Sequence, residues 1–193
     1  MNAIRIIHSE HRSLAAVLHG MLHLVNEIAS RNDTPNFALF GAMVYYIDTF
    51  AERFHHPKED AYLFKSLRLR APDAAALVDR LETEHRAGAR KIRTLEQSLQ
   101  RYEQGGPGEF AAFAGALRSY AAFHWEHMRT EEDRLLPLAR AHLTESDWQR
   151  IDDAFAGNSD PLFGVDADAR YGALFRRIVS LAPPPIGVGP ATT

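Results

Sequence analysis

Apolar residues recur every three or four positions along four long stretches of the chain, which is the spacing of one helix face. No stretch sustains the alternation of apolar and polar residues that is typical of strands. The inward positions of the first stretch are Ile4, Ile7, His11, Leu14, Leu18, Met21, Val25 and Ile28. Those of the second, at about residues 36–67, are Phe40, Val44, Ile47, Ala51, His55, Glu59 and Tyr62.

The third and fourth stretches follow the same rule and are bounded by helix-breaking residues. Pro72 and Asp73 open the third, because proline fits the first turn of a helix and aspartate can cap it. Its inward positions are Ala74, Val78, Leu81, His85, Gly88, Ile92, Leu95, Leu99 and Tyr102. The glycine-rich run 105–108 ends it, and the fourth stretch has Phe110, Phe113, Leu117, Tyr120, His124, His127 and Glu131 inward. Short connections at 29–36, 68–72 and 104–108 predict an all-α, up-down-up-down four-helix bundle.

The residues after this bundle predict short helices and a tail. Thr144 and Asp147 resemble a capping box that starts a helix with Trp148, Ile151 and Phe155 on its apolar face, packed on one end of the bundle. A second short helix is expected around 166–181. We therefore expect three regions: the bundle at 1–142, a helical extension at 143–181 and a Pro/Gly-rich tail at 182–193.

Composition narrows the choice of partners and compartment. The 193 residues carry a net charge of −3, so no basic surface is expected for nucleic acid. No apolar run approaches the ~20 residues of a membrane span, and the charged N-terminus does not look like a secretory signal. We expect a cytoplasmic protein. With ten histidines and no cysteine, any metal must be bound by nitrogen and oxygen.

Histidines and glutamates on the predicted seams are the candidate chemistry, because buried polar groups are costly unless paired. His55 and Glu59 are four residues apart, as are His127 and Glu131, so each pair lies on one helix face. The stretch of chain from His11 to the first pair is about long enough to run up one helix and down the next. The stretch from His85 to the second pair has a similar length, so all these residues can lie at one level. The predicted site thus holds four imidazoles and two carboxylates at one level of the bundle. Such donors suit two first-row ions, with iron the best candidate and manganese or zinc its rivals.

These motifs, with Glu10 before His11 and Glu84 before His85, resemble the haemerythrin-like HHE cation-binding domain over about residues 4–140. The resemblance implies a non-haem diiron four-helix bundle that binds or reacts with dioxygen, nitric oxide or peroxide. Carried over position by position, it implies metal ligands at His11, His55, Glu59, His85, His127 and Glu131, with the two glutamates bridging.

Other polar residues receive separate predictions. His8 and His124 lie one turn from predicted ligands, and we expect them to hydrogen-bond to the site without binding metal. Four histidines off the seams are expected to face solvent: His19, His23, His56 and His142. Pro57 removes a backbone hydrogen bond and predicts a kink in the second helix.

Two alternative functions remain open at this point. The pairs Glu52–His55 and Glu82–His85 match the Glu-x-x-His motif of ferritin-like diiron carboxylate oxidases. Three residues of helix, however, turn each glutamate about 60° away from its histidine. The other alternative is a binding module that senses iron or oxygen and acts through a separate protein partner.

Overall fold

The computed structural model describes residues 1–31, 34–156 and 178, and all regular structure in these ranges is helical. We use the word rod for one long helix or for an uninterrupted run of helical segments. The first rod is α1 (Asn2–Arg31). The second comprises α2 (Phe37–Tyr46), the π-helical η1 (Ile47–His55), α3 (His56–Lys58), the π-helical η2 (Glu59–Phe64) and α4 (Lys65–Arg70). The all-α prediction is confirmed for the described residues.

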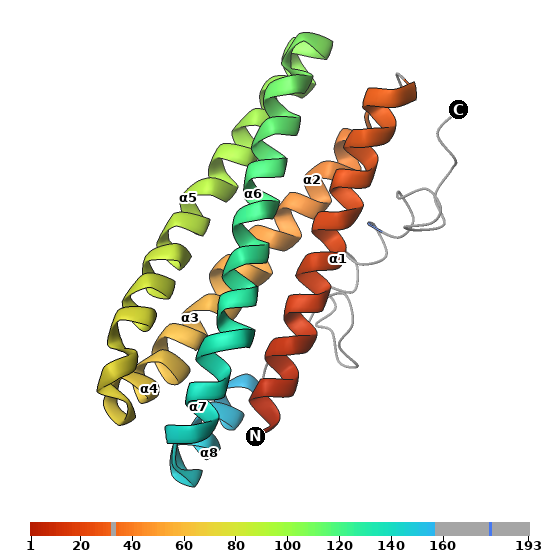
Figure 1. The fold of residues 1–193 in the computed structure, drawn as a ribbon. Helices are drawn as coiled ribbons and strands as arrows, with labels where there is room; N and C mark the ends of the chain where they lie inside the picture. Colours follow the sequence, from red (N-terminus) through yellow and green to blue (C-terminus); the bar gives the residue numbers. More distant parts are fainter. Residues whose placement is uncertain (32–33, 157–177, 179–193) are drawn as a thin grey trace.

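Two more rods and one shorter helix complete the described fold. The 3-10 turn η3 (Pro72–Ala74) leads into α5 (Ala75–Gly105). A second 3-10 turn, η4 (Gly106–Glu109), leads into α6 (Phe110–Thr130), the π-helical η5 (Glu131–Leu135) and α7 (Leu136–His142). The last described helix is α8 (Glu145–Ala156). Figure 1 shows the long rods side by side, with α6 between α5 and α1 and in contact with both.

The turn between α5 and α6 depends on a glycine. Gly106 follows the last residue of α5 and has a φ of +76°, a conformation that side chains with a Cβ disfavour. The predicted break at 105–108 therefore matches the observed end of α5.

The buried apolar residues form two clusters. One contains Leu14, Val44, Ile92, Leu117 and their neighbours, and the other contains Ile7, Leu67, Leu81, Leu135 and theirs. Along the first three rods, the predicted seam histidines and glutamates fall between the residues of one cluster and those of the other, and on the fourth rod Met128 of the first cluster lies among them. The fold thus sets a polar layer between two hydrophobic cores.

The second rod departs from the predicted seam at one position. Tyr62 is 43% exposed, whereas Leu63 and Phe64 are fully buried, so the inward assignment of Tyr62 is wrong. The π-helical segment η2 explains this shift, because its wider turns move the inward face relative to a 3.6-residue repeat. Pro57 lies in α3, between the two π-helical segments of this rod.

Helix α8 closes the core that contains Ile7. Its cap is reciprocal: the backbone N–H of Asp147 donates to Oγ1 of Thr144, and the N–H of Thr144 donates to Oδ2 of Asp147. Its apolar face, formed by Trp148, Ile151 and Phe155, is buried in the cluster as predicted. The predicted helix at 166–181, apart from Ile178, and the tail at 182–193 lie outside the described residues. Among the described residues, no helix is long and apolar enough to cross a membrane.

Candidate metal centre

The six predicted ligands meet in the polar layer between the two cores, and all are buried. We call this cluster the metal centre; it consists of His11, His55, Glu59, His85, His127 and Glu131. The Nε2 atoms of His11 and His55 are 3.3 Å apart, and those of His85 and His127 are 3.1 Å apart. The structure therefore brings together every residue that the sequence pattern proposed as a ligand.

The two glutamates lie between these histidine pairs. Oε2 of Glu59 is 3.3 Å from Nε2 of His55 and 3.5 Å from Nε2 of His85. The carboxylate of Glu131 lies 3.3 to 3.5 Å from the Nε2 atoms of three histidines: His11, His85 and His127. Each carboxylate is thus placed to be shared between the two pairs.

The glutamate oxygens provide the test of whether a metal fits. All four side-chain oxygens of Glu59 and Glu131 are buried, and none makes a hydrogen bond to a described residue. Buried carboxylate oxygens without hydrogen bonds are costly, and the nearby histidines offset only part of that cost, whereas a bound cation would offset more of it. Donors on one ion with bonds of about 2.0–2.2 Å lie about 3 Å apart, close to the Nε2–oxygen separations found here. The residues present therefore fit bound metal ions.

Each histidine of the metal centre is held at Nδ1 by a carboxylate, which turns Nε2 toward the glutamates. The pairs are His11 with Glu132 (2.8 Å), His55 with Glu10 (2.6 Å), His85 with Asp60 (2.8 Å) and His127 with Glu84 (3.0 Å). An ionised carboxylate accepts, so Nδ1–H donates and Nε2 carries the lone pair that a metal requires. Such carboxylate–histidine pairs are typical of metal sites.

These holding carboxylates follow the duplicated sequence pattern. Glu10 precedes His11 in sequence but holds His55, on the next rod. The second half of the chain repeats this arrangement with Glu84, His85 and His127. Asp60 and Glu132 directly follow the two shared glutamates, and each holds the lone histidine of the other half. The duplication therefore extends to the residues that orient the ligands.

The charges of the metal centre differ between its two glutamates. Burial, followed by the charge of Glu131, raises the pKa of Glu59 well above its usual range. For Glu131, burial opposes ionisation, but His127 and the other nearby histidines outweigh it and hold the pKa well below its usual range. Burial alone would lower the pKa of His127, yet the adjacent Glu131 raises it to about 10. Protons thus compensate part of the buried charge in the metal-free protein.

π-helical turns lie at the predicted ligands of the second and fourth rods. His55 is the last residue of η1, whereas Glu59 and Glu131 are the first residues of η2 and η5. A π-helical turn contains more residues than an α-helical turn and frequently occurs at functional sites. Local backbone geometry and side-chain chemistry therefore change at the same positions.

His56 is the main residue that the sequence interpretation missed. It was expected to face solvent, but it is only 4% exposed. Its ring stacks on that of His85, with centroids 4.2 Å apart and planes 13° apart, and its Nδ1 is 3.2 Å from Oε2 of Glu52. A strict heptad places His56 off the seam, whereas the π-helical turns of this rod bring it inward.

Glu52 is the centre of a second buried polar cluster. Tyr120 donates a hydrogen bond of 2.7 Å to its Oε1, and Nε2 of His124 lies 3.2 Å from the same oxygen. A Cβ added at Gly88 would come within 2.9 Å of this carboxylate, so the glycine leaves the space that Glu52 fills. The histidine neighbours keep the pKa of Glu52 low despite its burial, so it is ionised.

The other histidines and glutamates singled out in the sequence lie either near the metal centre or at the surface. His124 is buried beside Glu52, and Nδ1 of the half-buried His8 is 3.3 Å from Glu132. Three of the four histidines assigned to solvent are exposed as expected: His19, His23 and His142. Glu82 forms an ion pair with Arg68 at 3.0 Å. Among the described residues, neither Glu82 nor Glu52 belongs to a group whose donor atoms lie close enough to share a metal ion, and the ferritin-like alternative therefore has no geometric support.

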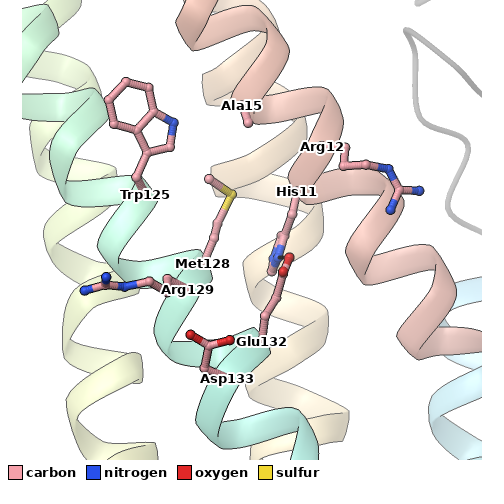
Figure 2. Close-up of a pocket in the computed structure, with 8 residues that line it drawn as sticks. All are labelled: His11, Arg12, Ala15, Trp125, Met128, Arg129, Glu132 and Asp133. Carbon is pink, nitrogen blue, oxygen red and sulfur yellow. Dashed lines mark hydrogen bonds and ion pairs between the residues drawn. The ribbon is translucent and has the colours of Figure 1, made fainter.

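A groove between α1 and the fourth rod leads to one side of the metal centre (Figure 2). Its volume is about 290 Å³, and its lining residues are His11, Arg12, Ala15, Trp125, Met128, Arg129, Glu132 and Asp133. Figure 2 shows the His11 and Glu132 side chains next to each other, with the Arg12 and Arg129 side chains directed away from each other. A small molecule in the groove would therefore lie next to His11, a predicted ligand.

Comparison with known proteins agrees with this geometry. The family model for the haemerythrin HHE cation-binding domain matches residues 2–139, which include all six residues of the metal centre. No curated protein and no solved structure matches the chain. The duplicated His/Glu motifs, their convergence and the family match together show that this chain belongs to the haemerythrin HHE cation-binding family.

Proposed function

We propose that this protein binds two iron ions at its metal centre and binds or reacts there with a small ligand: dioxygen, nitric oxide or peroxide. The observation that carries the proposal is the set of four buried carboxylate oxygens without hydrogen bonds, next to four histidines oriented by other carboxylates. The up-down-up-down topology of the family, with Glu59 and Glu131 as bridging ligands, is part of this proposal.

The donor set favours two ions over one. His11, His55 and Glu59 form one group whose donor atoms lie within 4.8 Å of one another. Glu59 is also in a second group, with His85 and Glu131. Two histidines for each ion and two shared carboxylates leave a first-row ion below six-coordinate. When bound, a ferrous pair would supply open positions and electrons for a small ligand.

The residues of the chain would control access and hold the ligands in place. The apolar clusters on either side of the polar layer restrict water, so charge in the layer is weakly screened. The groove of about 290 Å³ is large enough for a diatomic molecule or peroxide, and Met128 and Trp125 give it apolar walls. Its size supports small ligands over bulky substrates.

Metal loading followed by ligand exposure tests the function. We expect two iron ions per chain after anaerobic ferrous loading, and fewer in His85→Ala, measured by elemental analysis. Stopped-flow absorption should then change on mixing with dioxygen, nitric oxide or hydrogen peroxide. Zero ions, or one ion that His85→Ala leaves in place, would contradict the dinuclear centre. If none of the three ligands changes the spectrum of a fully loaded centre, an iron-sensing module acting through a partner becomes the better hypothesis.

A blocking substitution tests the groove as the route of entry. Ala15 lines the groove, whereas its neighbour Ala16 is exposed on α1 and does not line it. Ala15→Phe should slow the reaction of the loaded protein with each ligand while leaving its metal content unchanged. Ala16→Phe is the matched control and should react at the rate of the unaltered protein. Equal rates for both variants would show that ligands enter elsewhere.

Three further expectations stay predictions: a cytoplasmic location, a protein partner, and the division at residues 142 and 181.

A further inference from the structure

We propose that His8 and Glu132 form an entry site for the metal centre: they take a divalent first-row cation from solvent and pass it inward, without being permanent ligands. The proposal rests on the metal-binding function proposed above. It deepens that function by giving the buried centre a route for loading on one side of the bundle.

The burial of the metal centre is the first argument. Its six residues are at most 5% exposed, so an arriving cation needs a group at the surface that leads to them. Of the four carboxylates that hold the ligand histidines, Glu10 and Glu84 are the less accessible. The side chains of Glu132 and Asp60 are 34% and 40% exposed. Glu132 and Asp60 are therefore the candidates for the first contact with a cation.

The contacts of Glu132 favour it over Asp60. Its Oε1 atom lies 2.8 Å from Nδ1 of His11 and 3.3 Å from Nδ1 of the half-buried His8. His8 and His11 lie one turn apart on the same face of α1. One carboxylate oxygen thus joins an imidazole that reaches solvent to an imidazole of the metal centre. A cation held by His8 and Glu132 would lie next to His11.

The groove between α1 and the fourth rod gives Glu132 access to solvent. Glu132 and Asp133 both line it. Two arginines line it as well, but Arg129 is ion-paired with Glu126, and Figure 2 shows the Arg12 side chain directed away from Arg129. Three carboxylates against two guanidinium groups leave the groove and its rim with a surplus of negative charge, which attracts cations.

The pair is suited to capture and not to storage. Imidazole and carboxylate are both donors that first-row ions accept. Among the described residues, however, His8 belongs to no group of three donors whose atoms lie within 4.8 Å of one another. Two donors hold an ion more weakly than the larger donor set of the metal centre. An ion captured at His8 and Glu132 is therefore free to move inward.

The second half of the chain carries an arginine at the corresponding place. Glu82 lies three residues before His85, as His8 lies three residues before His11. Arg68 is ion-paired with Glu82 at 3.0 Å. A metal ion that approaches Glu82 therefore meets a guanidinium group, which assigns the entry to the side of His8.

The rate of metal uptake tests the proposal separately from the final metal content. Metal-free protein is mixed anaerobically with Co²⁺, uptake is followed by the visible absorption of bound cobalt, and elemental analysis gives the ions per chain. We expect His8→Gln to load about 10-fold more slowly and to reach the same content. Glu82→Gln, at the corresponding position, and His23→Gln, at an exposed histidine of the same helix, should load at the unaltered rate.

A charge series at position 8 separates capture from a structural role. Aspartate can bind a cation as histidine does, so His8→Asp should restore most of the rate. His8→Lys should load more slowly than His8→Gln, because its ammonium group repels the arriving ion. A merely structural contact predicts the opposite order, since lysine can pair with Glu132 and aspartate cannot.

The outcomes separate this proposal from the metal centre itself. Unchanged uptake in His8→Gln, or faster uptake in His8→Lys than in His8→Asp, would overturn the entry site and leave the metal centre standing. Loss of a whole ion from His8→Gln would make His8 a permanent ligand and would also overturn it. Failure of the unaltered protein to bind Co²⁺ and iron would contradict the metal centre.

Discussion

The two halves of the metal centre have the same residue types and different surroundings. The first half consists of His11, His55 and Glu59, and the second of His85, His127 and Glu131. Both use a lone histidine, a His-x-x-x-Glu pair and carboxylates at Nδ1. However, Glu131 approaches three histidines and Glu59 two. A groove reaches the first half, and His56 packs on the second. A duplicated motif can thus become two unequal sites through the residues beside it.

The largest expected effect follows from the unequal glutamates. Glu131→Ala removes the carboxylate that approaches histidines of both halves, so we expect loss of both metal ions. His11→Ala removes a donor from the first half alone and should retain one ion. Elemental analysis of the two loaded variants measures the difference. Equal metal content in both would show that Glu131 is not shared.

The stability of the metal-free protein should distinguish Glu59 from Glu131. The raised pKa of Glu59 means that folding disfavours its charge, so Glu59→Leu should stabilise the protein at neutral pH by about 1–4 kcal/mol. The gain should vanish as the pH falls below about 4, where the unfolded carboxyl is also protonated. Glu131→Leu should destabilise by about 3–5 kcal/mol, because it strands charged histidines. Urea unfolding with chelator present measures both, and the same sign for both variants would contradict this difference.

The holding carboxylates offer a finer test of the comparison. Glu10 and Glu84 occupy equivalent positions, but their side chains are 3% and 19% exposed. Glu10→Gln should lower metal affinity by about 10–100-fold, and Glu84→Gln by less, because water can replace part of the lost hydrogen bond. Competition titration with a coloured chelator measures each value. A larger effect at Glu84 would reverse the prediction.

The smallest effect is a difference in pH dependence. An imidazole must lose its proton to bind metal, so a raised pKa means stronger proton competition as the pH falls. Neighbouring carboxylates outweigh burial and raise the pKa of both His85 and His127, the latter to about 10. In the first half, Glu131 and Glu132 outweigh burial and raise the pKa of His11, but burial and the charge of His11 lower the pKa of His55. Metal titrations at descending pH should therefore show the second-half ion weakening more steeply. Parallel curves for the two ions would remove this distinction.

Much of the site follows from periodicity. The seam positions of His11 and His85 and the repeated four-residue pairs sufficed to predict six residues that the fold brings together, because an α-helix repeats its faces regularly. The same regularity failed at Tyr62 and His56. Both lie on the rod that contains η1 and η2, where π-helical turns change the phase. The spacing of apolar residues along this rod does not signal such a turn in advance.

The sequence by itself determined the helical class, the six clustered residues and their duplication, since these depend on residue type and spacing along single helices. The tertiary structure alone decided which carboxylate holds which histidine. Glu10 holds a histidine 45 residues away, and Glu132 holds one 121 residues away. It also decided that His56 is buried and that the groove lies beside Met128. Such contacts depend on how neighbouring rods pack and rotate, which spacing within one helix does not specify.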